Sequence, residues 1–304
     1  MSMQVGSAGE PAHQPSVRLA ERENSAAKFK AAAMNWLLLL PATLFLIGCF
    51  GVPLLALVKI SFEGEGGPFS AYETLIFDDV FLTVFWNTSK LAIIVTMISV
   101  LLAYPTAFLL SRLRGTLLSI ALYCILVPFW ISVLVRTFSW MLLLERNGPV
   151  NGTLMFLGIT DQPLKLLFNN FSVYLGMIHV LLPYAVLPIY SSMLKLDQRL
   201  IQASNGLGAT NLQTFWKVYL PLTANGVMTG AIFVFLMALG FYITPSLLGG
   251  LNNLTVAMLI DNFVNERLIW PLAAAASFIL LVIILVILGV ATRFIALKQA
   301  VTVR

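Results

Sequence analysis

The chain has 304 residues, of which 59% are hydrophobic and 10% are charged, and its formal net charge is +5. A soluble domain carries about 25% charged residues, so this composition excludes an ordinary water-soluble enzyme and indicates a chain whose solvent is lipid. The length accommodates about six membrane helices of about 20 residues each, together with their loops.

Six apolar stretches are long enough to cross the hydrocarbon core of a membrane. They cover residues 36–58, 88–110, 117–144, 171–193, 226–248 and 271–291. A spanning segment must satisfy its own backbone hydrogen bonds, so helices are expected, whereas a β-barrel would show short alternating strands. Prolines inside the stretches, such as Pro105, Pro128 and Pro183, predict kinks. The expected fold class is an all-α polytopic membrane protein with six transmembrane helices.

The six stretches divide the chain into a transmembrane domain over residues 36–296 and two tails, residues 1–35 and 297–304. From about residue 16, the first tail carries basic residues among small and apolar ones. This pattern fits a helix lying on an anionic leaflet, and it fits a disordered basic tail equally well. The role of this tail therefore stays open.

The charges of the loops predict the orientation of the chain. The loops and tails on the N-terminal side hold twelve basic and four acidic residues, whereas the opposite loops hold four basic and nine acidic residues. Lys90 and Arg136 remain within predicted spans. The positive-inside rule places both termini in the cytoplasm. A model with five or seven spans would mix the two sets of loops.

The sequence lacks the usual patterns of catalytic and metal sites. It contains no G-x-x-x-x-G-K-[ST] motif for ATP, no paired histidines or cysteines at metal-ligand spacing and no Ser-His-Asp set. We therefore expect no catalytic residue, metal or cofactor in this chain, and no nucleic-acid partner. No Asp or Glu lies well inside a span, which disfavours an ion-coupled secondary transporter. A membrane enzyme or an assembly anchor is the third and least favoured class.

The longest predicted cytoplasmic loop between spans covers residues 194–225. Short helices are expected in it, with an apolar side formed by Leu200, Ile201, Leu207 and Leu212. Gly206 and Gly208 interrupt the pattern, and Pro221 precedes the next span. A moderately apolar helix outside the membrane needs a partner, which is either the membrane interface or a groove on another protein.

The same loop carries a resemblance to a known family. Gln202-Ala203-Ser204, three residues, Gly208, nine residues and then Val218-Tyr219-Leu220-Pro221 resemble the "EAA" loop of permease subunits in binding-protein-dependent ABC importers. That pattern is E-A-A-x3-G-x9-I-x-L-P, and the spacing agrees without gaps. Gln202, Ser204 and Val218 depart from it, and the neutral Gln202 puts any ionic contact at this position in doubt.

Further segments are similar to the spermidine/putrescine branch of this family, and the resemblance covers residues 36–296. They are Asn87-Thr88, Ala103-Tyr104-Pro105-Thr106-Ala107-Phe108, Val127-Pro128-Phe129-Trp130, Leu134-Val135-Arg136-Thr137, Leu182-Pro183-Tyr184, Pro188-Ile189-Tyr190-Ser191-Ser192 and Lys195-Leu196-Asp197. These segments are less specific than the loop motif. Related branches import opines, amino-acid-like amines, phosphonates, thiamine or iron, so these solutes remain alternatives to a polyamine or related cationic amine.

The resemblance implies a type I ABC importer permease in a bacterial cytoplasmic membrane. A second permease subunit, making a heterodimer, completes the pore, and two ATPase subunits bind ATP and Mg. A periplasmic or extracellular binding protein delivers the solute, and membrane lipid surrounds the helices. The short coupling helix of the loop fits a groove on an ATPase subunit. The expected coupling residues are Gln202, Ala203, Ser204, Gly208, Ala209, Leu220 and Pro221. The alternative is that the glycines only shape a loop.

Six residues are candidates for the translocation pathway or its gate. They are Phe129, Trp130, Arg136, Trp140, Tyr184 and Tyr242. The aromatic rings offer faces to an amine through cation–π contacts, although packing and the interfacial aromatic belt explain any single ring as well. Arg136 is expected to form a gate or an ion pair, or to extend to the membrane surface. His179 is expected to be packed and hydrogen-bonded.

Overall fold

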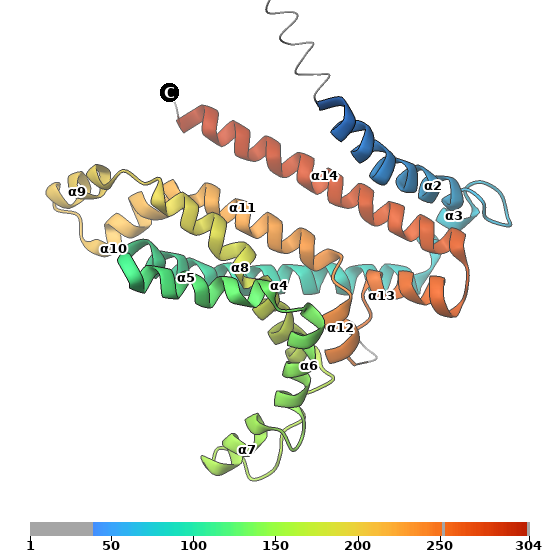
Figure 1. Cartoon of the computed structure of the whole chain (residues 1–304), viewed down its shortest axis with the longest axis horizontal. Coiled ribbons are helices and arrows are strands. Elements are labelled where there is room, and N and C mark those ends of the chain that lie inside the picture. The colour runs from blue at the N-terminus through green and yellow to red at the C-terminus, as the bar shows by residue number, and fades with distance from the viewer. Residues whose placement is uncertain (1–38, 251–252, 303–304) are drawn as a thin grey trace, which may run out of the picture. The chain divides into compact units, whose positions relative to one another are not determined.

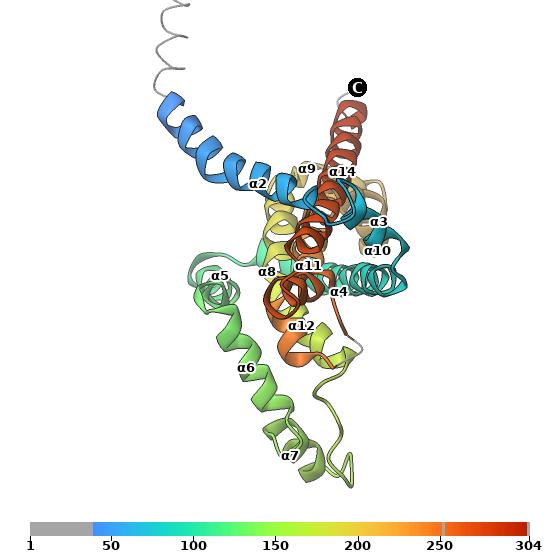
Figure 2. The same ribbon diagram turned by 90° about the vertical axis from the view of Figure 1, so that its right-hand side faces the viewer.

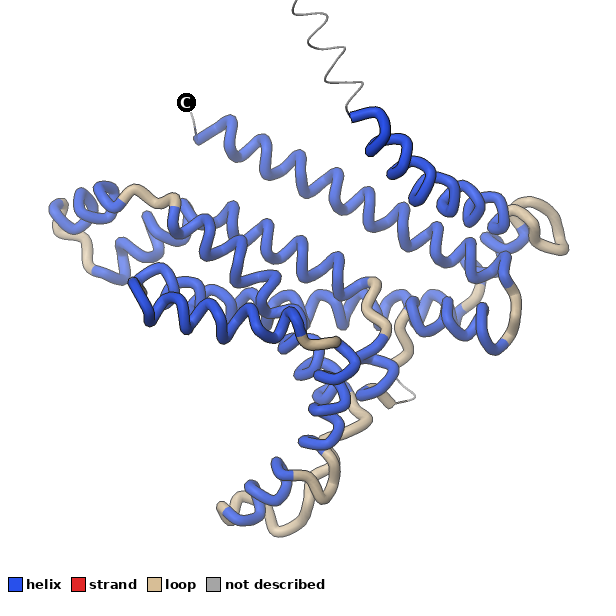
Figure 3. Tube along the Cα trace, viewed as in Figure 1, coloured by secondary structure: helices blue, strands red, loops and turns tan. Residues whose placement is uncertain are grey.

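The computed structural model describes residues 39–250 and 253–302, which form helices joined by loops, without a strand in these ranges (Figures 1 and 3). The chain divides into two units, Met1–Leu57 and Val58–Arg304. In the first unit, the described residues are helical from Leu39 on and include a π-helical segment, η1 (Ile47–Gly51). The helix continues as α2 (Val52–Ser61) into the second unit. The expected interfacial helix before residue 36 lies outside the described residues.

The second unit contains the remaining elements. They are α3 (Ser70–Phe77), α4 (Asp79–Arg112), α5 (Gly115–Trp130), α6 (Val133–Leu144), α7 (Pro149–Phe156), α8 (Asn170–Leu194), α9 (Gln198–Gly206), α10 (Asn211–Thr214), η2 (Phe215–Tyr219), α11 (Leu220–Leu239), α12 (Ile243–Leu248), α13 (Val256–Asp261), η3 (Asn262–Glu266) and α14 (Trp270–Thr302). Across the described ranges, five helices are long and apolar enough to span a membrane, or six if the bent α5–α7 segment is one span. The all-α fold class is confirmed.

The prediction of one continuous helix over residues 117–144 is wrong, because the helix is interrupted within this range. The segment Gly115–Trp130 and the segment Val133–Phe156 are bent by 99° (Figure 2). Pro128 supplies no backbone N–H, and its carbonyl accepts a bond from the N–H of Ile131 at 3.3 Å. Ile131 and Ser132 then take extended conformations, so the kink predicted at a proline becomes a full break three residues later.

The expected span over residues 226–248 is also displaced. The helix starts at Asn211 and ends at Leu239, and α12 follows as a separate short helix. Pro221 lies in the first turn of α11 rather than before it, because the π-turn η2 precedes it and Leu220 N bonds to Phe215 O. The loop is therefore shorter than the expected range 194–225 and consists of the residues between α8 and α10. At the C-terminus, α14 continues into the expected tail.

The core lies where α4, α8 and α11 pack against one another (Figure 1). Small residues permit this close approach, as is usual between membrane helices. Ala92, Ala103 and Ala107 of α4 are buried. At Gly230 of α11, an added Cβ atom would lie 3.0 Å from the carbonyl oxygen of Ala185 in α8. Helix separation in this core is therefore set by residues without large side chains.

Hydrogen bonds between helices fix the alignment of the core. Tyr104 Oη lies 3.0 Å from Thr223 Oγ1, which joins α4 to α11. Thr137 Oγ1 lies 3.1 Å from Thr244 Oγ1, which joins α6 to α12. Ser172 of α8 donates to the carbonyl oxygen of Leu248 at 2.8 Å. Each such bond contributes about 0.6–2 kcal/mol in a membrane protein.

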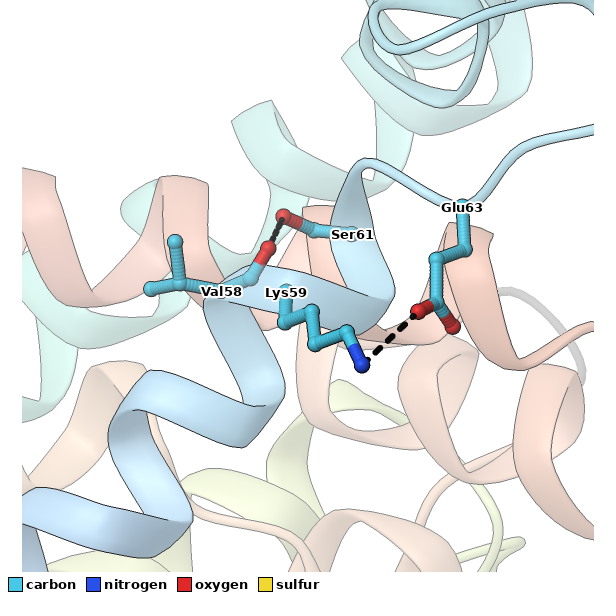
Figure 4. A network of polar contacts seen from close by, with 4 residues as sticks. All are labelled: Val58, Lys59, Ser61 and Glu63. Atoms are coloured by element: carbon cyan, nitrogen blue, oxygen red, sulfur yellow. Dashed lines mark hydrogen bonds and ion pairs between the residues drawn. The ribbon is translucent and has the colours of Figure 1, made fainter.

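At the start of the second unit, the Ser61 hydroxyl forms a hydrogen bond with the backbone in the last turn of α2 (Figure 4). Ser61 Oγ donates to the carbonyl oxygen of Val58 at 2.6 Å, and Tyr72 Oη of α3 lies 2.6 Å from the same Ser61 oxygen. The Tyr72 ring also packs edge-on against Phe278 of α14, with centroids 6.5 Å apart. The nearby Lys59–Glu63 pair, at 3.7 Å, is exposed and contributes little.

Candidate functional site

The connection between α8 and α11 contains the short helix α9, at one end of the helices it joins (Figure 1). Asp197 caps the start of α9, because its Oδ1 accepts the N–H of Arg199 at 2.9 Å. Thr210 caps α10 in a capping box with Gln213. Both caps come from polar residues at helix starts, so the local sequence encodes two short helices with a turn between them.

Gly208 forms the turn between α9 and α10. Its φ is +83°, in the region that favours glycine, whereas Gly206 has no positive φ. An added Cβ at either glycine would meet no atom within 4 Å among the described residues. Gly208 is therefore required here for its backbone conformation rather than for close packing.

The end of α9 exposes apolar side chains. Leu207 is 89% exposed, and Leu200, Leu212 and Trp216 are exposed as well, whereas Ile201 packs against the core. Exposed apolar groups clustered outside the packed core indicate an interaction surface. We call the exposed residues Leu200, Gln202, Ala203, Leu207 and Gly208 the α9 tip.

The expected coupling residues separate into three groups. Gln202, Ala203 and Gly208 are exposed at the α9 tip, and Ala209 is half-buried beside it. Ser204 faces inward, where its Oγ lies 3.0 Å from Thr214 Oγ1. Leu220 and Pro221 lie in the first turn of α11, beyond η2. Three of the seven residues, Gln202, Ala203 and Gly208, are therefore exposed at the α9 tip.

Two residues that the sequence reasoning missed anchor α9. Thr214 is buried, and its Oγ1 donates to Asn205 Oδ1 at 3.0 Å while lying at the same distance from Ser204 Oγ. We call Ser204, Asn205 and Thr214 the α9 anchor. An Asn and a Thr nine residues apart carry no recognisable sequence signal, because the turn at Gly208 is what brings them together.

Aromatic rings continue from the α9 anchor into the core. Phe215 packs edge-on against Tyr104 of α4, with ring centroids 5.8 Å apart, and stacks on Tyr219, with ring centroids 6.2 Å apart. Phe108 contacts Tyr219 at 5.3 Å, and the Arg112 guanidinium lies 4.2 Å from the Phe108 ring centre. The packed rings therefore form a continuous contact from η2 to the end of α4.

The Thr214→Val variant is expected to weaken the α9 anchor without unfolding the chain. Valine keeps the shape but removes the hydroxyl that bonds Asn205 and Ser204, which costs about 1–3 kcal/mol. We expect uptake by the reconstituted transporter to fall while the melting temperature of the purified protein changes little. Thr106→Val is the matched control, since Thr106 is half-buried and, among the described residues, its hydroxyl bonds only to Leu102 O of its own helix. Equal uptake by both variants would contradict a role for the anchor.

Four of the six pathway candidates lie together. Phe129, Trp130, Arg136 and Tyr184 line one pocket of about 240 Å³ at the break between α5 and α6. The Phe129 and Tyr184 ring centres are 4.6 Å apart. These residues come from three helices, and the bend at the break brings them together.

The other two candidates lie outside this pocket. Trp140 Nε1 donates to His179 Nδ1 at 3.1 Å, so both residues have a packing role, as expected for His179. Tyr242 donates to Asp261 Oδ2 at 3.0 Å, between the end of α11 and α13. This hydrogen bond to Asp261 raises the pKa of the Tyr242 phenol. Lys90 is exposed on α4.

Comparison with known proteins assigns the family. A family model described as "Binding-protein-dependent transport system inner membrane component" matches residues 29–297. The chain belongs to this family of ABC importer permeases. The spermidine/putrescine transport system permease protein PotB of Escherichia coli (strain K12) is 35% identical over 211 residues, covering 69% of this chain and 76% of PotB. The PotB of Haemophilus influenzae is 32% identical over 249 residues, covering 80% and 87%. These relatives confirm the resemblance to the polyamine branch.

Solved structures agree on the fold. A bacterial ABC transporter involved in the import of the acidic polysaccharide alginate superposes with a TM-score of 0.67 at 17% identity, covering 90% of this chain and 98% of that chain. The MetNI methionine ABC transporter superposes with a TM-score of 0.54 at 15% identity, covering 71% and 95%. The permease is therefore a multi-pass membrane protein with the type I importer fold.

Proposed function

We propose that this permease forms half of the translocation pathway of a bacterial ABC importer and couples solute uptake to ATP hydrolysis by separate ATPase subunits. The observation that carries the proposal is the α9 tip, an exposed apolar surface that the α9 anchor holds against the core. A helix of this kind, outside the spanning segments, suits docking into a groove of another protein. ATP and Mg are held by the ATPase subunits.

Coupling requires that α9 move as a rigid body with the spanning helices. The hydrogen bonds of Thr214 join α9 to α10, and Phe215 and Tyr219 continue the contact to Tyr104 and Phe108 of α4. ATP binding closes the ATPase dimer and favours one of two pore conformations, because a ligand shifts an equilibrium toward the state that it binds better. The α9 tip is the part of this chain that receives the motion.

The proposed solute is a polyamine or a related cationic amine. The PotB relatives support this class, and the ring faces of Phe129 and Tyr184 suit an amine through cation–π contacts. A separate binding protein delivers the solute, and a second, non-identical permease completes the pore. Both termini lie in the cytoplasm according to the distribution of basic residues.

Site-directed cross-linking tests the proposal. Cys49 and Cys124 are free cysteines, so both are first replaced by serine. A cysteine introduced at Gln202 is expected to cross-link to an ATPase subunit in the intact transporter, and one introduced at Phe156 is not. Phe156 is the matched control, because it is highly exposed but lies on α7, away from α9 (Figure 1). Failure of cysteines along the α9 tip to capture an ATPase, or uptake by the purified chain alone under an ion gradient, would contradict the proposal.

A further inference from the structure

The pocket at the α5–α6 break contains a buried, unpaired cation. Arg136 is 8% exposed, and its Nε atom is buried without a hydrogen-bond partner. Within residues 39–250 and 253–302 it forms no ion pair. A charged group buried at membrane depth is costly unless it is paired. No carboxylate in this part of the chain pairs with the Arg136 guanidinium, and an anion from elsewhere would stabilise it.

The backbone around the pocket favours the same kind of ligand. Ser132 and Val133 line the pocket and begin α6, a helix of 12 residues whose N-cap makes no side-chain cap bond. The first N–H groups of a helix lack intrahelical partners and carry the positive end of its dipole. Arg136 lies in the first turn and adds its own positive charge there. A carboxylate satisfies both the free N–H groups and the guanidinium.

The described residues do not supply this anion. The proposed solute is a cation, so repulsion excludes it as the partner of Arg136. Trp130 at the pocket is 90% exposed, and Val135 and Phe138 on the same helix as Arg136 are also exposed. This face is therefore uncovered by the described chain, and in the proposed importer it is available to the second membrane subunit.

We infer that the Arg136 pocket receives an Asp or Glu side chain from a spanning helix of the second membrane subunit, an inference that rests on the proposed function. The ion pair joins the two subunits at the bend between α5 and α6. It also neutralises Arg136, so that a cationic amine can pass the adjacent rings of Phe129 and Tyr184. The same pairing explains why an arginine occurs in a pathway proposed for cations.

The test uses the complete transporter, with its cognate second subunit and ATPases. Arg136→Gln is expected to lower ATP-driven putrescine uptake by about tenfold or more. A tenfold loss corresponds to about 1.4 kcal/mol. It is also expected to reduce the amount of second subunit that co-purifies. Arg136→Lys is expected to retain part of the uptake and part of the co-purification. Lys90→Gln is the matched control, because Lys90 is a cation exposed on α4, and it should leave both readouts unchanged.

A double-mutant cycle then identifies the partner. Each Asp and Glu in the spanning helices of the second subunit is neutralised, alone and together with Arg136→Gln. One of them is expected to cause no further loss in the Arg136→Gln background, and exchanging the two charges should restore co-purification. Additive losses at every carboxylate, or an unchanged Arg136→Gln complex, would overturn the inference.

Two further readouts separate this inference from its alternatives. If sodium glutamate or acetate raises the melting temperature of the wild-type complex and not of the Arg136→Gln complex, the pocket holds a small anion, and the inference is wrong. If the wild-type complex does not transport putrescine, the proposed solute is wrong. The co-purification cycle still decides whether Arg136 pairs with the second subunit.

Discussion

Gly208→Val is expected to abolish ATP-driven uptake while the protein still reaches the membrane in normal amounts. Gly208 has a φ of +83°, and a β-branched residue is strongly disfavoured there, by about 1–2 kcal/mol or more. Because the turn at Gly208 brings Ser204 and Asn205 onto Thr214, a changed turn also misplaces the α9 tip. Uptake of radiolabelled putrescine and the membrane content of the permease are the measurements.

Two controls show whether conformation is the cause. Gly208→Asn is expected to keep most of the uptake, since Asn tolerates a positive φ and no described atom lies within 4 Å of the added Cβ. Gly206→Ala is expected to be neutral, because Gly206 ends α9 without a positive φ. Loss of uptake with Asn would instead indicate that the space at this position is filled by the ATPase subunit. Normal uptake with Val would refute the role of the turn.

Gly226→Leu is expected to prevent folding, because there is no space for the added side chain between α11 and α8. An added Cβ at Gly226 would lie 2.7 Å from Pro188 O and 3.1 Å from Ile189 Cα, and it would also collide with Ser192 Cβ. These are mainly backbone atoms of α8, so the clash is relieved only if α8 and α11 separate. Even Gly226→Ala is expected to cost about 1–3 kcal/mol as overpacking.

The measurement is the yield and melting temperature of the purified permease in detergent. Gly289→Leu is the matched control, because Gly289 lies in the exposed part of α14 and no described atom is within 4 Å of its added Cβ. Normal yield and melting for Gly289→Leu, with loss of folded Gly226→Leu, is the expected result. A folded Gly226→Leu protein would show that α8 and α11 do not pack as closely as described.

The α9 anchor joins the loop between α8 and α11 to the membrane helices. Hydrogen bonds from Thr214 hold α9, and the stacked rings of Phe215 and Tyr219 connect it to α4. Loops usually move independently of the core, but this one is joined to α4 and α11 by packed side chains. Coupling over this distance needs such contiguous contacts between elements that change position together.

Hydropathy and local motifs predict the membrane class, the helical fold and the loop that carries the family motif. Hydropathy over about 20 residues reports burial in lipid directly. The capping residues Asp197 and Thr210 act within a few positions of themselves, so short helices in the loop were also predictable. Gln202, Ala203 and Gly208, which the resemblance to the permease family implies as coupling residues, lie exposed on one small surface.

The positions of the helix breaks and the contacts between distant side chains follow from tertiary packing. Hydropathy does not distinguish a straight span from one bent at Ile131 and Ser132, since both bury the same apolar residues. The pocket lined by Phe129, Tyr184 and Arg136 forms at that bend. Trp140 lies outside the pocket, where its indole N–H donates to His179. Contacts between residues far apart in the chain depend on how the helices pack, and the spacing of residues within one segment does not report that packing.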